Sequence, residues 1–408
     1  MNLDEPTGRP WLTPSSYWPA LSAATADLDT PFGVISQPAL AYNTHDMLRR
    51  ANGTTIRVAS KSIRVRGVID AVLKLPGYYG VLAYTLPEAL WLAETITDVV
   101  VGYPSVDRAA LARLATSPEL AARVTLMVDS VDQLDVVDSV LAPDKRETVR
   151  VSLELNASWR SKILGYTGVY RSPVQSVEDA TALARAIIAR PGFRLVGMMA
   201  YEAQIAGVVN RPTGKPILGR AVDWMQQSST VELHERRGAV VAALRELTEL
   251  EFVNGGGTGS LERTASDPSV TEIAAGSGLF GPHLFDGYSH FQPAPAAAYS
   301  LSVVRKPAPD MATLLGGGWI ASGPPAIDRM PQLAWPAGLE YVSRESAGEV
   351  QSPLKGAAAA ALSVGDRVWL RHTKAGELSE HLNEFAIVDG DNIVDTMPTY
   401  RGEGKAFL

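Results

Sequence analysis

The chain has 408 residues, of which 46% are apolar and 20% are charged, a composition typical of a globular protein with a substantial core. The formal net charge of -7 argues against nucleic acid as a partner, and the lack of cysteine excludes disulfides, thiolate nucleophiles and cysteine-bound zinc. The first residues are acidic without an apolar core, and the longest run of small residues, 356–362, is too short to cross a membrane. We therefore expect a cytoplasmic protein without a membrane partner.

Residues 1–30 contain four prolines and several aromatic side chains, which favours an irregular arm with a short helix near 14–25. The sequence then predicts a strand over 32–36 and an amphipathic helix over 39–51. Apolar runs that predict strands follow at 56–60, 78–84, 98–103, 123–129, 149–155, 193–201, 251–255 and 271–276. Segments of helical period lie between them at 62–75, 86–96, 105–116, 130–141, 174–190 and 217–249.

Most of these strands are apolar on both faces, as strands of buried parallel sheets are. Eight such strands alternating with helices over about 220 residues fit a closed (β/α)8 barrel better than a doubly wound sheet. From about residue 298 the sequence changes to short β runs and glycine turns, which predicts a smaller all-β domain. The predicted α/β fold thus comprises an arm (1–30), a barrel (31–295) and a C-terminal β-domain (296–408). Whether strand 32–36 belongs to the barrel or joins the β-domain is left open.

Lys61 follows the first strand of the predicted barrel. Because side chains alternate along a strand, Arg57, Ala59 and Lys61 share one face, and Arg64 and Arg66 follow closely. A lysine that is crowded by other cations and partly desolvated loses its proton more readily, as an imine-forming amine must. The alternative that this segment leaves open is a solvated lysine just past a strand.

Two glycine turns follow the seventh and eighth strands. The first is Asn-Gly-Gly-Gly-Thr-Gly-Ser over 254–260, and the second is Ala-Gly-Ser-Gly over 275–278. Consecutive glycines let backbone N–H groups converge on an anion, and the hydroxyls of Thr258 and Ser260 can add donors. In (β/α)8 barrels these two loops often form a phosphate site. The Gly-Lys-Ser/Thr ending of a nucleotide P-loop is missing, and two tight turns without a ligand remain the alternative.

A lysine after strand one and a phosphate-type turn after strands seven and eight are neighbours in a closed barrel, which suggests pyridoxal phosphate. On these residues the chain resembles the fold-type III pyridoxal-phosphate enzymes, in particular the D-threonine aldolase and D-serine dehydratase group, distant relatives of alanine racemase. The resemblance is carried by Thr30-Pro31, 57–64, 154–160, 197–202, 255–260, 272–278 and Ser379-Glu380-His381. Within 57–64, the residues Val58, Ala59 and Ile63 depart from the family's Arg-Pro-His-x-Lys-Thr-His-Lys pattern.

The resemblance implies that Lys61 is the Schiff-base lysine and also the base, with His381 as a second catalytic residue. It further implies that the cofactor is bound by Lys61, Arg57, Arg160, Tyr201, Gly256, Gly257, Thr258, Gly276 and Ser277. Three of these roles have open alternatives: Tyr201 as a barrel-lining core residue, Arg160 as a loop arginine with surface ion pairs, and His381 as an ordinary loop histidine.

The chain departs from the metal-dependent members of this group near its C-terminus. Those members carry a Pro-x-His-x-Cys/Asp segment, whereas this sequence has Pro398-Thr399-Tyr400-Arg401-Gly402. A phenol and a glycine do not make a Zn²⁺ or Mn²⁺ site, and His381 alone cannot hold the ion. We therefore expect no divalent metal, and we regard Tyr400 as a candidate acid–base hydroxyl.

The predicted function is that of a pyridoxal-phosphate-dependent lyase acting on a small amino acid of D configuration, by deamination or retro-aldol cleavage. An amino-acid racemase of the same fold and a non-catalytic carrier of the cofactor are the alternatives. The predicted β-domain favours an enzyme, because carriers on this barrel typically lack a second domain. A decarboxylase is disfavoured because those usually rely on an active-site cysteine. By analogy with fold relatives we expect a homodimer.

Overall fold

The computed structural model describes residues 1–324 and 326–408. Its contacts divide the chain into two compact units. The β unit comprises 1–46, 62–72 and 277–406, and the barrel unit comprises 47–61, 73–276 and 407–408. These limits differ from the predicted domain limits at 30/31 and 295/296, which stay a prediction.

The barrel unit is built around a closed barrel of parallel strands, which confirms the predicted fold class. The order around the barrel is β10-β11-β2-β3-β4-β5-β6-β9. The strands are β2 (Thr55–Ala59), β3 (Tyr78–Ala83), β4 (Val99–Val101), β5 (Val124–Val128), β6 (Val149–Glu154), β9 (Phe193–Ala200), β10 (Phe252–Gly255) and β11 (Glu272–Ala275). Each of the eight predicted apolar runs therefore overlaps one strand of the barrel.

The helices of the barrel unit follow the predicted alternation. They are α4 (Leu86–Leu92), α5 (Arg108–Thr116), α6 (Pro118–Arg123), α7 (Val131–Val140), α8 (Val177–Ala189), α9 (Ala203–Ala206), α10 (Pro216–Arg245) and α11 (Leu261–Ala265). Side-chain caps fix several starts: Thr85 and Asp107 accept the N–H groups of Glu88 and Ala110. A hairpin of β7 (Trp159–Ser161) and β8 (Gly165–Thr167), which sequence patterns did not predict, lies between β6 and α8.

The helix predicted over 62–75 is shorter in the structure. Ser60–Ser62 form a 3-10 turn, and α3 spans only Arg66–Val72. Arg64 has a φ of 53°, a left-handed conformation that a helix cannot contain. The chain therefore leaves β2 through a tight turn that carries Lys61.

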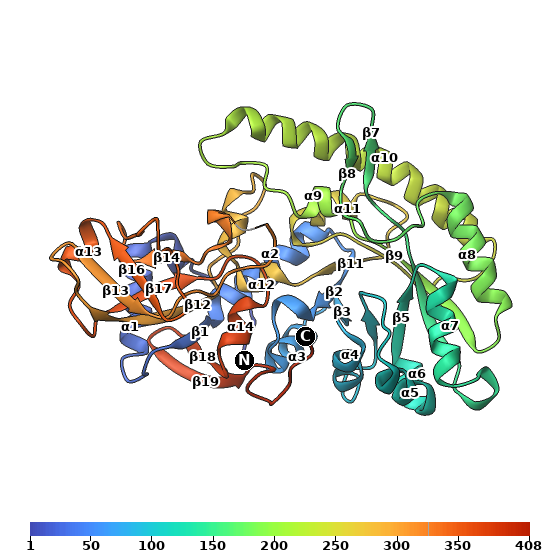
Figure 1. Cartoon of the computed structure of the whole chain (residues 1–408), viewed down its shortest axis with the longest axis horizontal. Helices are drawn as coiled ribbons and strands as arrows, with labels where there is room; N and C mark the ends of the chain where they lie inside the picture. The colour runs from blue at the N-terminus through green and yellow to red at the C-terminus, as the bar shows by residue number, and fades with distance from the viewer. Residues whose placement is uncertain (325) are drawn as a thin grey trace. The chain divides into compact units, whose positions relative to one another are not determined.

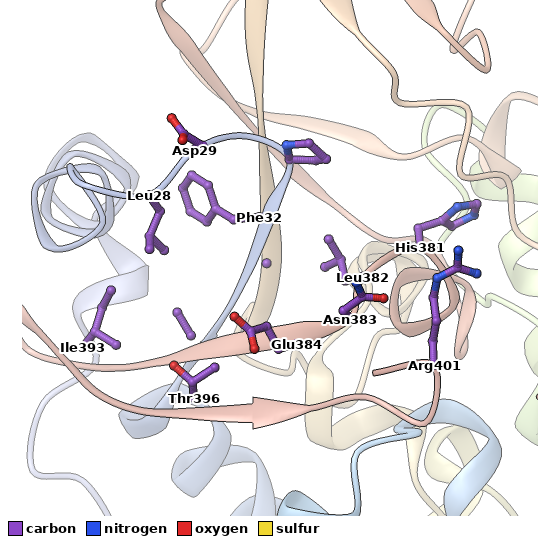
Figure 2. A pocket seen from close by; sticks show the side chains of 13 residues that line it. Leu28, Asp29, Phe32, His381, Leu382, Asn383, Glu384, Ile393, Thr396 and Arg401 are labelled. Carbon is purple, nitrogen blue, oxygen red and sulfur yellow. The ribbon is translucent and has the colours of Figure 1, made fainter. Parts of the chain in front are cut away.

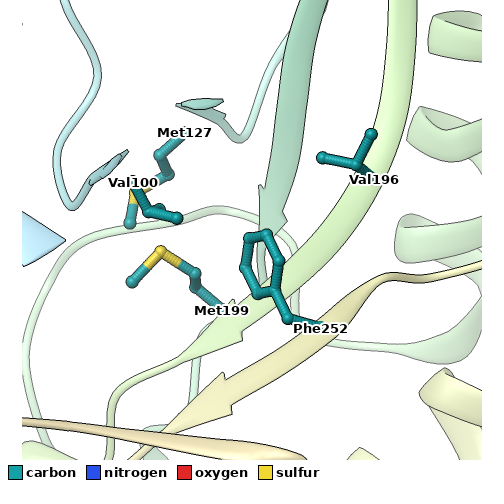
Figure 3. Packing of buried hydrophobic residues seen from close by; sticks show 5 residues of the cluster. All are labelled: Val100, Met127, Val196, Met199 and Phe252. Atoms are coloured by element: carbon teal, nitrogen blue, oxygen red, sulfur yellow. The ribbon is translucent and has the colours of Figure 1, made fainter. Parts of the chain in front are cut away.

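A hydrophobic cluster from neighbouring strands packs the barrel (Figure 3). It consists of Val100, Met127, Val196, Met199 and Phe252, with Leu82 against it. Gly197 makes room for the Phe252 ring, because a Cβ at residue 197 would lie 2.4 Å from Cζ of that ring. Packing of this kind is the main source of barrel stability, at about 25 cal/mol per Å² of apolar surface removed from water.

The β unit contains a sheet of nine strands, counted over the described residues. Its main path is β15-β16-β13-β12-β1-β18-β19, with β17 and β14 joined beside β12. The strands are β1 (Phe32–Ser36), β12 (Ala297–Arg305), β13 (Met311–Leu315), β14 (Gln332–Trp335), β15 (Glu340–Tyr341), β16 (Gln351–Lys355), β17 (Arg367–Arg371), β18 (Glu384–Asp389) and β19 (Asn392–Pro398). In Figure 1 the blue β1 lies among orange and red strands, because it pairs with β12 and β18.

The remaining helices are short or belong to the N-terminal region. They are α1 (Pro14–Ala24), α2 (Gln37–Ala51), α3, α12 (Ser277–Phe280), α13 (Ala357–Ala361) and α14 (Glu377–His381). Across residues 1–324 and 326–408, no helix combines the length and hydropathy that crossing a bilayer requires.

Candidate functional site

Lys61 lies at the carboxyl end of the barrel, in the turn that follows β2. Its side chain is half-buried, and Nζ donates a hydrogen bond to Oη of Tyr103 at 3.3 Å. Tyr103 comes two residues after β4, so the two side chains meet from the ends of strands separated only by β3. The predicted lysine therefore has a phenol beside it that sequence patterns did not single out.

Arg171 joins Tyr103 to Tyr201. Its guanidinium carbon lies 5.4 Å from the ring centroid of Tyr103 and 4.9 Å from that of Tyr201, within cation–π range of both. Burial acts to raise the pKa of Tyr103, but the charges of Lys61 and Arg171 and the hydrogen bond from Lys61 outweigh it and lower that pKa. Burial raises the pKa of Tyr201 to about 12. Of the two phenols, only Tyr103 is electrostatically prepared to lose a proton.

Glu154, the last residue of β6, is a buried carboxyl in the same barrel. Its side chain is only 5% exposed, and this burial raises its pKa to about 7, against the opposing charge of Arg171 and with the aid of Asp129. The electrostatic influence of Glu154 also reaches Tyr103. A carboxyl that changes charge near neutral pH at the end of a barrel strand is typical of functional sites.

The first glycine turn packs directly against Tyr201. A Cβ at residue 257 would lie 3.3 Å from Cε2 of Tyr201 and 3.2 Å from Cβ of Ala206. Gly256 has a φ of 73°, which favours glycine, and a Cβ there would lie 2.7 Å from Oγ1 of Thr264. The turn is therefore closed to a side chain at residue 256 and tight at residue 257, and its backbone lies next to an aromatic ring.

A buried network of charges holds this turn in shape. Glu202 accepts the Gly256 N–H at 2.9 Å and the Thr264 hydroxyl at 2.5 Å, and its Oε2 lies 3.5 Å from Nη1 of Arg237. Arg237 is fully buried, and its Nε donates to Asp267 at 2.8 Å. The Gly256 N–H, which was expected to serve the cofactor, is thus directed at Glu202, so that Gly256 contributes to the shape of the turn.

The other predicted turn residues lie at the same end of the barrel or just beyond it. Thr258 is buried, and its carbonyl oxygen accepts a hydrogen bond from Arg50 at 2.6 Å. Gly276 follows β11 and has no room for a side chain, because a Cβ would lie 2.2 Å from the carbonyl oxygen of Ala59. Ser277 begins α12 and belongs to the β unit.

Arg57 is buried in the barrel and fully engaged with carboxylates. Its Nε and Nη2 donate to Glu272 at 2.7 and 2.8 Å, and its Nη1 donates to Asp98 at 2.6 Å. The guanidinium carbon also lies 5.3 Å from the centroid of the Phe252 ring. A buried arginine requires anionic partners, and Arg57 finds them in Glu272 and Asp98 of the barrel unit.

Arg160 lies on the exposed hairpin, in β7. Its Nε donates to Gln175 at 2.8 Å, and its guanidinium carbon lies 5.5 Å from the ring centroid of Tyr166. The arginine that does reach the tyrosines at the barrel end is Arg171, eleven positions further along the chain. Its only sequence signal is its place in the segment that follows the fifth barrel strand.

The crowding of Lys61 by other cations stays a prediction, and the structure shows a carboxylate partner for each of the three arginines near it in the sequence. Arg57 is paired within the barrel unit, and within the β unit Arg64 pairs with Glu380 and Arg66 pairs with Glu403. Each of the three positive charges therefore has a carboxylate beside it. Within the barrel unit, the Tyr103 phenol is a hydrogen-bonding neighbour of Lys61.

His381 lies in the β unit, at the end of α14. Its imidazole stacks on the Trp319 ring at 4.8 Å and 4°, and Trp319 stacks in turn on the buried Tyr299 at 4.2 Å. Burial, followed by the charge of Arg401, lowers the pKa of His381. Figure 2 shows His381 and Arg401 together along a pocket of about 600 Å³, lined by residues of the β unit alone.

Tyr400 and Gly402, which stand where the metal ligands of related sequences are expected, are both part of a packed turn. Tyr400 is 1% exposed, and its N–H donates to the Arg64 carbonyl oxygen at 2.8 Å. At residue 402 a Cβ would lie 1.8 Å from the carbonyl oxygen of Asn383. The described residues contain no group of three or more histidine, cysteine or acidic side chains arranged to hold a metal ion.

Comparison with characterised proteins finds two aldolases among the similar sequences. The 3-hydroxy-D-aspartate aldolase of Paracoccus denitrificans (strain Pd 1222) is 27% identical over 259 residues, which is 62% of this chain and 61% of that protein. The D-threonine aldolase of an Arthrobacter species is 26% identical over 325 residues, covering 76% of this chain and 78% of the relative.

Solved structures share the fold over nearly the whole chain. The D-threonine aldolase of Filomicrobium marinum superimposes with a TM-score of 0.76 at 21% identity, covering 92% of this chain and 96% of the other. The D-threo-3-hydroxyaspartate dehydratase of Delftia sp. HT23 gives a TM-score of 0.68 at 20% identity, with 92% and 98% covered. Residues 35–283 match the family described as alanine racemase, N-terminal domain. The match spans more than half of the sequence, and this chain is therefore a member of the alanine racemase N-terminal domain family of fold-type III proteins.

Proposed function

We propose that the protein is a pyridoxal-phosphate-dependent lyase that acts on a small D-amino acid, with Lys61 holding the cofactor. The observation that carries this proposal is the placement of the Lys61 amino group at the carboxyl end of the barrel. There, the strand ends beside it lead into turns without room for side chains. In barrels of this class the carboxyl end is where catalysis takes place.

The residues at this end of the barrel suit pyridoxal phosphate. The Lys61 amine suits the aldehyde, the Tyr201 ring offers a surface for the pyridine, and the turn at 255–260 suits the phosphate. Gly256 has no space for a Cβ and a Cβ at residue 257 would be tight, as expected for backbone that approaches a ligand closely. The cofactor would supply the aldehyde for an amine and a ring that accepts electrons.

The roles of the protein's own residues follow from their contacts. Lys61 would anchor the cofactor and then remove a proton from the substrate, at Nζ. Arg171, exposed and next to two phenols, is the cation available in this barrel for a substrate carboxylate. Glu202, Arg237 and Asp267 would keep the turn in its shape from beneath, without contacting the substrate.

A lyase outcome is favoured over racemisation by the relatives. Those with detectable sequence identity are named 3-hydroxy-D-aspartate aldolase and D-threonine aldolase. Both names describe cleavage of a D-configured hydroxy amino acid, which supports a substrate with a β-hydroxyl group. The alignment with the first relative spans 61% of that protein, so the substrate assigned here remains our proposal.

The assignment of Lys61 is tested by reducing the protein with borohydride in the presence of pyridoxal phosphate and mapping the modified peptide by mass spectrometry. We expect the label on Lys61 in the wild type and no label in Lys61→Ala. Lys74→Ala, which removes an exposed lysine of the same unit, should label normally. A Lys61→Ala protein that still carried the label at the barrel end would disprove the assignment.

The reaction is tested with a panel of D- and L-amino acids, with and without a chelator. We expect aldehyde, keto acid or ammonia from a D-configured β-hydroxy amino acid, and undiminished turnover in chelator, because residues 400 and 402 offer no metal ligands. Formation of the enantiomer alone would favour a racemase. The absence of turnover across the panel, with the label on Lys61, would favour a carrier.

A further inference from the structure

We propose that Tyr103 is a further catalytic residue, which exchanges a proton with the amino group of Lys61. The inference rests on the proposed function, because it gives the phenol a part in the work of the proposed catalytic lysine. Nothing in the names of the relatives or in the matched family assigns this role.

The geometry places the two reacting atoms in contact. Nζ of Lys61 donates to Oη of Tyr103 at 3.3 Å, and the same nitrogen lies 5.9 Å from the Tyr103 ring centroid. The lysine therefore approaches the hydroxyl and not the ring face. Both side chains are half-buried, so water is only partly excluded from the pair. The separation of 3.3 Å is a hydrogen-bond distance, close to the range of about 2.6–3.2 Å over which general acid–base catalysis moves a proton.

The charged and titratable groups that interact electrostatically with Tyr103 come from several different strand ends and loops. Lys61 follows β2, Arg171 lies in the segment between β8 and α8, Glu154 ends β6, and Tyr201 follows β9. The two cations favour the phenolate, whereas burial and Glu154 favour the neutral phenol. The balance is a lowered pKa, so the Tyr103 oxygen accepts and returns a proton more readily than an ordinary tyrosine does.

The proton exchange is balanced within the pair. When the ammonium of Lys61 gives up a proton, its N–H bond breaks, the electron pair stays on Nζ, and an O–H bond forms on the Tyr103 phenolate. Both charges disappear in this step, and no other reactant is needed. The product is a neutral amine, the form that Lys61 needs both to attack an aldehyde and to take a proton from a substrate. When the proton returns from the Tyr103 hydroxyl to Nζ, the ammonium and the phenolate form again.

A purely structural role for Tyr103 makes a different prediction. Its ring contacts the guanidinium of Arg171, and that contact requires the aromatic face and not the hydroxyl. Tyr103→Phe keeps the ring and removes only the oxygen. The matched control is Tyr79→Phe, which removes the hydroxyl of a tyrosine on β3 that is 55% exposed.

We expect Tyr103→Phe to lower kcat by about 100-fold or more, the range of general acid–base catalysis, with a much smaller change in KM. If ionisation of this pair limits kcat in the wild type, the plot of kcat against pH should shift along the pH axis in the variant. Borohydride labelling of Lys61 should be retained, and Tyr79→Phe should match the wild type. Equal kcat and an equal pH profile in Tyr103→Phe and wild type would overturn the proposal.

A second measurement does not depend on turnover. Tyrosine labelled with ¹³C at Cζ reports phenol ionisation by NMR in the full chain, freed of cofactor. We expect one resonance to titrate below the others, to vanish in Tyr103→Phe, and to titrate at higher pH in Lys61→Met. If Lys61 takes no label and no amino acid is turned over, the proposed function fails, while this titration still decides whether the pair exists. A Tyr103 resonance that ignores Lys61→Met would refute the pair itself.

Discussion

Among single residues, Glu154 links the site to the stability of the fold. Burial raises its pKa from 4.5 to about 7. Between these values the folded protein keeps a proton that the unfolded chain has already lost. Because the folded state then binds more protons, the free energy of unfolding falls as pH rises across this interval. Burial of the Glu154 carboxyl therefore lowers the stability of the fold least below neutral pH, where the carboxyl is protonated.

Glu154→Gln should remove this part of the pH dependence, because the amide keeps the shape of the side chain and does not ionise. Between pH 5 and pH 8 the wild type should lose up to about 3 kcal/mol more of its free energy of unfolding than the variant does. Denaturant unfolding of both proteins at several pH values checks this, with the exposed Glu178→Gln as control. Parallel pH dependences in wild type and Glu154→Gln would show that the carboxyl is ionised throughout.

At the scale of elements, the turn after β10 shows how backbone shape and a buried network depend on each other. Gly256 can adopt its positive φ without strain, and the resulting orientation aims its N–H at Glu202. Glu202 in turn needs that donor, together with Thr264 and Arg237, because a buried carboxylate without partners is costly. The shape of the proposed phosphate turn is thus determined from below, before any ligand binds.

Gly256→Ala should therefore damage both stability and ligand binding. The new methyl group would lie 2.7 Å from the Thr264 hydroxyl oxygen, and alanine would have to adopt the left-handed backbone conformation of Gly256. We therefore expect a loss of about 2 kcal/mol or more in the free energy of unfolding. Gly238→Ala, on α10 with open space around it, should instead stabilise by about 0.5–1 kcal/mol. Denaturant unfolding and titration with pyridoxal phosphate measure the two effects. An unchanged midpoint and affinity in Gly256→Ala would contradict this account.

Some elements and contacts of the barrel could be predicted from the sequence, and others could not. The barrel strands were predictable because most are apolar on both faces, and Lys61 was predictable because it follows the first of them. The partners of Arg57 were not, since Glu272 lies 215 positions away and becomes a neighbour only when the barrel closes. The hairpin β7–β8 escaped prediction because its strands are three residues long, and with it the approach of Arg171 to the tyrosines. Tyr103 carried one usable signal, its position at the end of the third barrel strand.

For the molecule as a whole, each compact unit is assembled from separate stretches of chain. The β unit takes up residues 1–46, 62–72 and 277–406, and its strand β1 pairs with β12 and β18, both from the C-terminal third. Val34 and Ile35 on β1 are fully buried in this arrangement. A cut between the predicted barrel and β-domain would therefore leave β1 without either of its neighbours.

The fragment 1–295 should fail to fold as a soluble barrel, because β1 would expose two buried side chains and both of its hydrogen-bonding edges. Expression of this fragment beside the full chain, with circular dichroism and thermal unfolding, checks the expectation. We expect aggregation or a broad transition for the fragment and a cooperative one for the full chain. A cooperative transition in the fragment, with Lys61 still labelled by pyridoxal phosphate, would instead support the domain limits predicted from sequence.

The crowded turn at Gly402 has a consequence for the history of the sequence. The resemblance places a metal ligand of related enzymes at this position, yet here any side chain would run into the carbonyl oxygen of Asn383. A single codon change at 402 therefore cannot restore a ligand, because the peptide between 383 and 402 would have to be rebuilt at the same time. A ligand at residue 402 would therefore need two coordinated changes, one in each of the two segments that meet there.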